Sequence, residues 1–170
     1  MLPLLAPLLV FTQTHLPSPA HLTTLRPRDA LDTLEHRKVS RALRSHRTGV
    51  AHPMAPRLLW TLSHIQRLSG GVPLRIVSAY RRPPTGAKLT ESRHYQGKAV
   101  DLIVPGMPKH ALFALCRSFS AHGCGFYPHA HFVHIDVREQ RGVWVDRSAP
   151  GEPRDYVPNA RQWLLARGLR

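Results

Sequence analysis

The chain is poor in acidic residues, and this shortage gives it a strong positive charge. Ten Asp and Glu residues face 24 Lys and Arg residues, so the formal net charge is +14. Such a charge favours polyanionic partners, namely nucleic acid, anionic lipid or an acidic cell-envelope polymer. The arginines are scattered from Arg26 to Arg170, with no block of like charge, and genome composition alone accounts for them equally well. Zinc-finger spacing and glycine-aromatic RNA-binding patterns are both missing, which makes nucleic acid the least favoured partner.

Cysteine is equally scarce, and its placement excludes two kinds of site. The two cysteines, Cys116 and Cys124, form no C-x-x-C pair, so a cysteine-ligated zinc site and a thioredoxin-like motif are both excluded. In an oxidising compartment the two could pair. We expect two small buried side chains instead, because Cys116 lies on a predicted helix beside core positions.

The sequence also lacks an apolar run long enough to span a bilayer. Residues 2–11 are apolar but too few to cross it, and Ser18-Pro19-Ala20 then offers small residues where a signal peptidase cuts. We expect residues 1–20 to be a signal peptide, with export to the periplasm or cell envelope and no transmembrane segment. Because the run is preceded by no Lys or Arg, the alternative is an apolar N-terminal segment that docks on the domain.

Hydrophobic periodicity predicts a single α+β domain. A length of 170 residues supports one ordinary core, and no internal repeat is visible. We expect a linker and short helices over residues 21–42 and the folded domain over residues 43–170. The positions of proline and glycine, together with the spacing of apolar residues, then predict three helices and three strands. The helices are expected over residues 56–68, 108–119 and 158–167, and the strands over residues 74–80, 99–104 and 132–137. Such an order indicates a small, mostly antiparallel sheet flanked by helices.

Three residues on this predicted framework form a candidate metal site. Asp101 and His134 lie on regular strands, so they can meet across neighbouring strands, while His94 comes from the loop before the first of them. Gly97 permits a tight path between His94 and that strand. Two histidines and one carboxylate suit a zinc ion with one open position, and zinc-bound water is a nucleophile near neutral pH. The pattern therefore predicts a hydrolytic zinc site on the sheet.

Four short motifs, in this order along the chain, resemble a known enzyme family. They resemble the zinc peptidases of bacterial cell walls, which include D,D-carboxypeptidases, D-alanyl-D-alanine dipeptidases and murein endopeptidases. The resemblance is greatest to the branch with the murein endopeptidase that cuts crosslinks between diaminopimelate residues, and it covers roughly Leu43 to Trp144. The motifs are Ser78-Ala79-Tyr80-Arg81-Arg82-Pro83, Ser92-x-His94-x2-Gly97-x-Ala99-x-Asp101, Gly123-Cys124-Gly125-Phe126-Tyr127-Pro128 and Phe132-Val133-His134-Ile135-Asp136.

This resemblance implies a zinc metallopeptidase that hydrolyses amide bonds in peptidoglycan stem peptides or crosslinks. It implies one Zn²⁺ per chain, bound by His94, Asp101 and His134, with peptidoglycan peptides as partners and anionic envelope polymers as further partners. It also implies that Arg81 faces the site. A guanidinium fixed there can bind a substrate carboxylate or stabilise a tetrahedral oxyanion.

The general base is the position where the chain departs from the family pattern. Related enzymes often have an acidic residue three positions before the last histidine ligand, and here that position is His131. Its imidazole could accept a proton, although its strand parity is opposite to that of His134. Asp136 has the right parity and is the other candidate, although an acceptor that orients a histidine suits it better. The missing acid leaves open a non-catalytic, zinc-containing module that binds cell-wall peptides.

Four further residues have two interpretations each. Tyr80, Tyr127 and Trp144 either line a cleft or belong to the core, and aromatic residues near strands more often belong to the core. Ser92 is expected to shape the loop around His94 rather than to react.

Overall fold

The structure is a computed structural model that describes residues 11–13 and 33–169. Most of the predicted signal peptide, and the predicted linker up to residue 32, therefore lie outside the described residues. Within the described part, the helices are all too short or too polar to cross a membrane.

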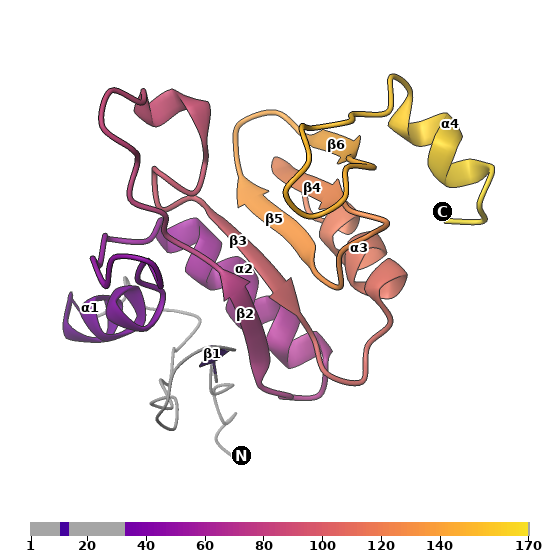
Figure 1. Ribbon diagram of the computed structural model, residues 1–170. Coiled ribbons are helices and arrows are strands. Elements are labelled where there is room, and N and C mark those ends of the chain that lie inside the picture. The colour runs from indigo at the N-terminus through magenta and orange to yellow at the C-terminus, as the bar shows by residue number, and fades with distance from the viewer. Residues whose placement is uncertain (1–10, 14–32, 170) are drawn as a thin grey trace, which may run out of the picture.

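A mixed six-stranded sheet organises the molecule, with the strand order β1-β2-β3-β5-β4-β6 (Figure 1). The pairs β2–β3, β3–β5 and β4–β5 are antiparallel, which agrees with the predicted mostly antiparallel sheet. The outer pairs, β1–β2 and β4–β6, are parallel. The strands are β1 (Phe11–Gln13), β2 (Leu74–Ser78), β3 (Ala99–Ile103), β4 (His122–Phe126), β5 (Val133–Val137) and β6 (Gly142–Val145).

Helices cover one face of this sheet and leave part of the other open. Figure 1 shows α2 and α3 behind the strands, α1 beside β2, and α4 next to β6 at the opposite end. The helices are α1 (Thr33–Ala42), α2 (Pro56–Leu68), α3 (Lys109–Ser118) and α4 (Ala160–Leu165), with a 3₁₀ turn at Leu89–Glu91. The predicted helices therefore all exist, with the last one shorter than expected and capped by the Asn159 side chain.

Alternation along β5 sorts apolar from polar side chains. Val133, Ile135 and Val137 belong to the buried apolar core beneath α2 and α3. His134 and Asp136 therefore point to the opposite face, since side chains alternate along a strand. The core thus supports the strands from behind and leaves their front face for polar chemistry.

Three strands of the sheet escape prediction from the sequence: β1, which falls within the predicted signal peptide, β4 and β6. β4 contains Gly123 and Gly125, which have no side chain to contribute to an alternating pattern, so the segment gives no strand signal. β6 is a four-residue edge strand that pairs in parallel with β4, and such a long-range partner has no local sign.

The two cysteines form a disulfide, contrary to the expectation of two unpaired buried side chains. Cys116 on α3 and Cys124 on β4 are both buried, and their Cα atoms lie 6.0 Å apart. α3 packs directly on β4, which brings the two Cβ atoms within bridging range. Their position in the core is therefore compatible with pairing, because the helix and the strand are core neighbours.

We predict that reduction of this disulfide destabilises the domain without unfolding it. The closed loop is short, with a sequence separation of 8 residues, and loop-closure entropy gives about 2.5 kcal/mol for a loop of that size. Thermal unfolding with and without dithiothreitol measures the difference. A Cys116→Ala/Cys124→Ala double variant is the control, since its midpoint should not respond to reductant. Two reactive thiols in the untreated, denatured protein would contradict the bridge.

Candidate metal centre

His94, Asp101 and His134 come together on the open face of the sheet. One donor atom from each lies within 4.8 Å of the other two, and all three residues are buried, with 3%, 2% and 7% of their surface exposed. We call these three residues the ligand group. In the described part of the chain, no other group of three or more His, Cys, Asp or Glu side chains brings its donor atoms close enough to hold a metal ion.

The register of two strands positions two members of the ligand group. Asp101 on β3 lies directly opposite His134 on β5, and Ala99 lies opposite Asp136 in the same ladder. Side chains opposite each other in an antiparallel pair are close neighbours on one face. His134 Nδ1 accordingly lies 2.8 Å from Asp101 Oδ1.

A tight loop brings His94 to the same point. Its Nδ1–H donates a hydrogen bond of 2.6 Å to the carbonyl of Ala79, just beyond β2. The turn that follows needs Gly97, which has a positive φ of 64° and packs so closely that a Cβ would lie 2.6 Å from the Pro53 carbonyl oxygen. With Nδ1 protonated, the Nε2 lone pair of His94 points at the ligand group, 3.2 Å from His134 Nδ1.

Burial and mutual charge set the protonation of the ligand group. Burial lowers the pKa of His94, and the nearby Asp101 carboxylate only partly opposes this. Burial would raise the pKa of Asp101, but the two histidines hold it well below its usual range. Burial would lower the pKa of His134, but its hydrogen bonds to Asp101 and Asp136 raise it. The group therefore holds an ionised carboxylate between two imidazoles.

This donor set fits a zinc ion. Two imidazole nitrogens and a carboxylate oxygen are ordinary zinc ligands, and three protein ligands are the usual number where a fourth position serves catalysis. The hydrogen bond to Ala79 fixes the tautomer of His94, as a second partner does for most metal-bound histidines.

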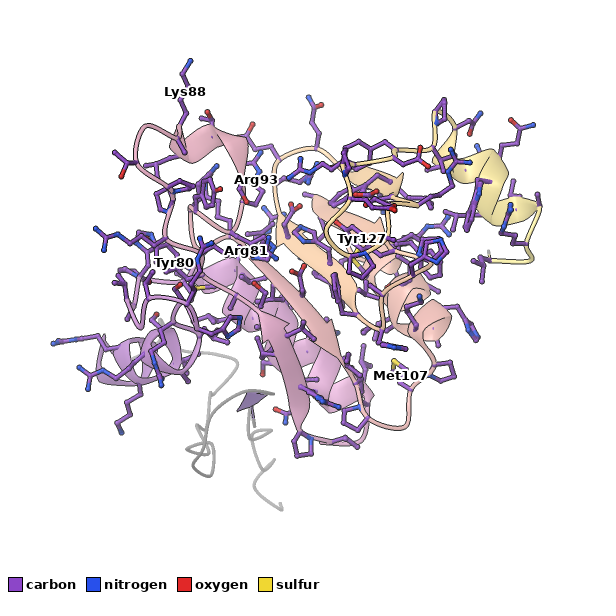
Figure 2. The ribbon with its side chains drawn as sticks, viewed as in Figure 1. Tyr80, Arg81, Lys88, Arg93, Met107 and Tyr127 are labelled. Atoms are coloured by element: carbon purple, nitrogen blue, oxygen red, sulfur yellow. A yellow bond between two sulfur atoms is a disulfide. The ribbon has the colours of Figure 1, made fainter. Side chains whose placement is uncertain are left out.

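Arg81 lies beside the ligand group, as the sequence suggests, and contacts it directly. Its guanidinium forms an ion pair with Asp101 Oδ2, and its Nε donates to the Ser78 hydroxyl at 2.8 Å. The side chain remains 47% exposed, and Figure 2 shows it near Tyr80, close to the end of β2. Arg81 therefore neutralises the Asp101 carboxylate and still presents N–H groups to solvent.

Asp136 is held by a residue that the sequence analysis does not single out, Arg138. Asp136 is fully buried, and the Arg138 guanidinium donates two hydrogen bonds to the two Asp136 carboxylate oxygens, one of them from Nε to Oδ1 at 2.7 Å. We call this two-pronged contact the Arg138 fork. The same carboxylate lies 3.2 Å from His134 Nε2. Burial would raise the pKa of Asp136, but Arg138 and His134 hold it well below its usual range. Asp136 is thus suited to orient His134 and poorly suited to accept a proton.

Glycines make room for this fork. A Cβ on Gly123 or Gly142 would overlap the Arg138 guanidinium, and one on Gly125 would lie 2.7 Å from the Trp144 indole. Arg138 also lies over the Trp144 ring, 5.2 Å from its centroid. An arginine two residues after Asp136 was the one available sign of this arrangement.

His131 lies outside the ligand group. It is exposed, it precedes β5 by two residues, and in the described chain it forms no hydrogen bond or ion pair with His94, Asp101 or His134. The loop before it is nevertheless fixed, because the Lys109 ammonium donates to the carbonyls of Tyr127, Pro128 and Ala130. Burial lowers the pKa of Lys109.

The three aromatic candidates divide between core and site. Tyr80 is buried and stacks on His52 at 4.7 Å, as core residues do. Trp144 is half-buried, lies 5.2 Å from the His134 ring and donates to the Tyr127 hydroxyl at 3.2 Å. Burial raises the pKa of Tyr127 to about 12, so this hydroxyl stays protonated. Tyr127 and Trp144 therefore form an aromatic wall beside the ligand group.

Comparison with known proteins places the chain in a peptidase family. The family model described as peptidoglycan L,D-endopeptidase MepK, within the M15 peptidases, matches residues 21–144. A probable peptidoglycan L,D-endopeptidase MepK from Haemophilus influenzae is 30% identical over 120 residues, which cover 63% of this chain and 64% of that protein. Peptidoglycan L,D-endopeptidase MepK from Escherichia coli K12 is 27% identical over 157 residues, covering 74% of this chain and 86% of its own.

No solved structure gives a significant match. The alignment with the Haemophilus protein spans slightly less than two thirds of that relative. M15 peptidases are zinc-dependent, and the ligand group is a possible metal site of the kind they require.

We predict that Arg138→Ala destabilises the metal-free protein by about 3 kcal/mol, because it leaves the buried Asp136 carboxylate without its partner. Arg147→Ala is the matched control, since Arg147 pairs with Asp155 where both side chains are about half exposed. Such an exposed pair contributes at most about 1 kcal/mol. Urea unfolding of both variants measures the contrast. An equal loss of unfolding free energy in the two variants would show that the contact between Arg138 and Asp136 stabilises the fold no more than an exposed ion pair does.

Proposed function

Because this chain belongs to the peptidoglycan L,D-endopeptidase MepK family of M15 peptidases, we propose that it is a zinc metallopeptidase acting on peptidoglycan. Its substrates are amide bonds of stem peptides or of the crosslinks between them, and the L,D bond that gives its relatives their name is the first candidate. The observation that supports this most is the buried ligand group of His94, Asp101 and His134 on the open face of the sheet.

The residues around the ligand group suit the binding of one zinc ion per chain. His94 offers Nε2, Asp101 offers Oδ1 and His134 offers Nδ1, because their other polar atoms face Ala79, Arg81 and Asp136. A zinc ion held by such ligands supplies Lewis acidity and lowers the pKa of a water molecule toward neutrality. The partners outside the group fix the orientation of each ligand before metal arrives.

Arg81 and His131 supply the remaining chemistry in this proposal. The exposed N–H groups of Arg81 bind a substrate carboxylate or the oxyanion that develops at the scissile carbonyl. A ring nitrogen of His131 accepts the proton from the attacking water and passes it to the leaving amine. Asp136 and Arg138 take no proton and hold His134 in place.

The proposed location is the cell envelope, after export. Three observations support it: the curated relatives are named for peptidoglycan, the Cys116–Cys124 disulfide suits an oxidising compartment, and the charge of +14 favours an anionic wall. We propose that residues 1–20 act as the signal peptide. β1 falls within them, so the sheet of the mature protein would begin at β2.

One observation favours the alternative of a non-catalytic module that binds wall peptides. The position three residues before His134 has a histidine where related enzymes often have an acid, and that histidine lies outside the ligand group. The same zinc fold without a base would bind its peptide and leave it intact.

We predict close to one equivalent of zinc in the purified protein and almost none in His134→Ala, because the variant loses one of three ligands. Added zinc should raise the unfolding temperature of the parent protein but not that of His134→Ala, since metal binds the folded state. Arg81→Ala is the matched control: it lies beside the group without donating a ligand atom, so it should still fill with zinc at saturation. Elemental analysis that finds equal zinc in the parent and in His134→Ala would exclude the site.

We predict that the zinc-loaded protein converts crosslinked peptidoglycan fragments into uncrosslinked ones, identified by mass spectrometry. His131→Ala should keep its zinc and lose roughly a hundredfold or more in turnover, as expected for loss of a general base, and His131→Glu should recover part of it. A fully active His131→Ala enzyme with an unchanged pH profile would remove His131 from the mechanism. A zinc-filled parent protein that binds wall peptides and cuts none would support the binding module.

A further inference from the structure

The outer face of α2 carries a row of exposed side chains that has no role in the metal centre. The buried residues of α2 face the core, and those that face solvent recur with the three- and four-residue spacing of one helix face. Trp60 and Leu68 are 47% and 53% exposed, and α2 contains no Asp or Glu. We call this row the α2 stripe, and its members are Arg57, Trp60, His64, Arg67 and Leu68.

Ring contacts fix the orientation of Trp60 within the stripe. Its indole stacks on the His64 ring, with the centroids 5.0 Å apart and the planes 16° from parallel. The His64 ring also makes an edge contact with Phe119, just after α3, at 5.7 Å, and the Arg67 guanidinium donates to His64 Nδ1 at 2.7 Å. The stripe therefore presents an ordered aromatic side chain, and binding a partner would cost little further conformational entropy at Trp60.

Positive charge flanks these apolar side chains and has no acidic partner. Among the residues that the structure describes, no carboxylate pairs with Arg57, Arg67 or Arg141. Arg57 donates instead to main-chain carbonyls, and Arg141 donates to the carbonyl of Phe119 at 3.5 Å, which places Arg141 beside the aromatic stack. A cationic surface of this kind attracts anionic groups.

The stripe and the ligand group lie on opposite sides of the sheet. α2 covers the back of the strands in Figure 1, whereas His94, Asp101 and His134 lie on the open face. A partner that contacts the stripe therefore leaves the open face free for substrate.

We propose that the α2 stripe docks the protein on an anionic lipid membrane, with the open face of the sheet turned away from the bilayer. The inference goes beyond the proposed function and shares with it only the location in the cell envelope. Tryptophan favours the membrane–water interface, a leucine side chain adds buried apolar area, and arginines near the surface attract anionic headgroups. The metal centre of a docked molecule then faces the space that the cell wall occupies.

The composition of the stripe favours lipid over two other kinds of partner. A wall polymer offers anionic groups but no apolar phase for Trp60 and Leu68. A protein interface normally involves about 20–30 residues on each side, whereas the stripe is a single row along one helix. Peripheral membrane binding requires only a few inserted apolar side chains with cations beside them.

The test is sedimentation of the full chain with lipid vesicles. We expect the parent protein to bind vesicles of equimolar phosphatidylcholine and phosphatidylglycerol roughly tenfold or more tightly than vesicles of phosphatidylcholine alone. Trp60→Ala/Leu68→Ala should weaken binding to the mixed vesicles by roughly tenfold or more, because it removes the inserted apolar area, and should keep the circular dichroism spectrum of the parent. No step of this test depends on zinc or on hydrolysis, so its failure is separate from a failure of the proposed function.

Two variants on α4 are the matched controls. Leu165→Ala removes a leucine that is 52% exposed, and Arg161→Glu changes the net charge by the same amount as Arg67→Glu. Arg67→Glu should weaken binding to the mixed vesicles roughly tenfold, and each α4 variant should weaken it about threefold at most.

Equal affinity of the parent protein for the two kinds of vesicle would overturn the inference. So would undiminished vesicle binding by Trp60→Ala/Leu68→Ala, which would place the contact elsewhere, such as in the apolar run of residues 2–11. If the stripe variants instead lost binding to purified peptidoglycan or to a partner protein and kept their binding to vesicles, the stripe would belong to that partner and the inference would be wrong.

Discussion

The pairing of β3 with β5 is the constraint on which the site depends. Because Asp101 lies opposite His134, two candidate ligands share one face without any help from loops. A slip of β3 by one residue would turn Asp101 toward α2 and α3 and place valine and leucine on the open face. The apolar residues of the two strands, Val100, Leu102, Val133 and Ile135, are fully buried against the helices, so the hydrophobic core enforces the register that the chemistry needs.

A second constraint is the neutralisation of buried carboxylates. Asp101 and Asp136 are almost inaccessible to water, and an isolated charge in such a place is costly. Each carboxylate is paired with an arginine: Arg81 forms an ion pair with Asp101, and Arg138 donates to both carboxylate oxygens of Asp136. His134 lies between these pairs, with Nδ1 2.8 Å from Asp101 Oδ1 and Nε2 3.2 Å from Asp136 Oδ2, so one imidazole links the two ion pairs. Part of the basic excess of the sequence thus has a structural use that composition alone does not reveal.

Prediction from sequence succeeded where a local pattern decides the outcome and failed where distant segments meet. Strand alternation indicated that Asp101 and His134 would share a face, and proline and glycine punctuation located α2 and α3. The Cys116–Cys124 bridge depends on how α3 packs on β4, which no spacing rule describes. Arg138 was missed because its role depends on two glycines, Gly123 on β4 and Gly142 on β6, whose missing side chains leave the space that it fills.

Gly123, Gly125 and Gly142 let the Arg138 and Trp144 side chains lie directly against the main chain of the open face. At Gly123, Gly125 and Gly142 the sheet has no side chains to exchange, and even a methyl group would collide with Arg138 or Trp144. A side chain at any of these positions would therefore displace Arg138 or Trp144, and with them the contacts that hold Asp136 and flank the His134 ring. New specificities in this scaffold should accordingly arise around these glycines more readily than at the glycines themselves.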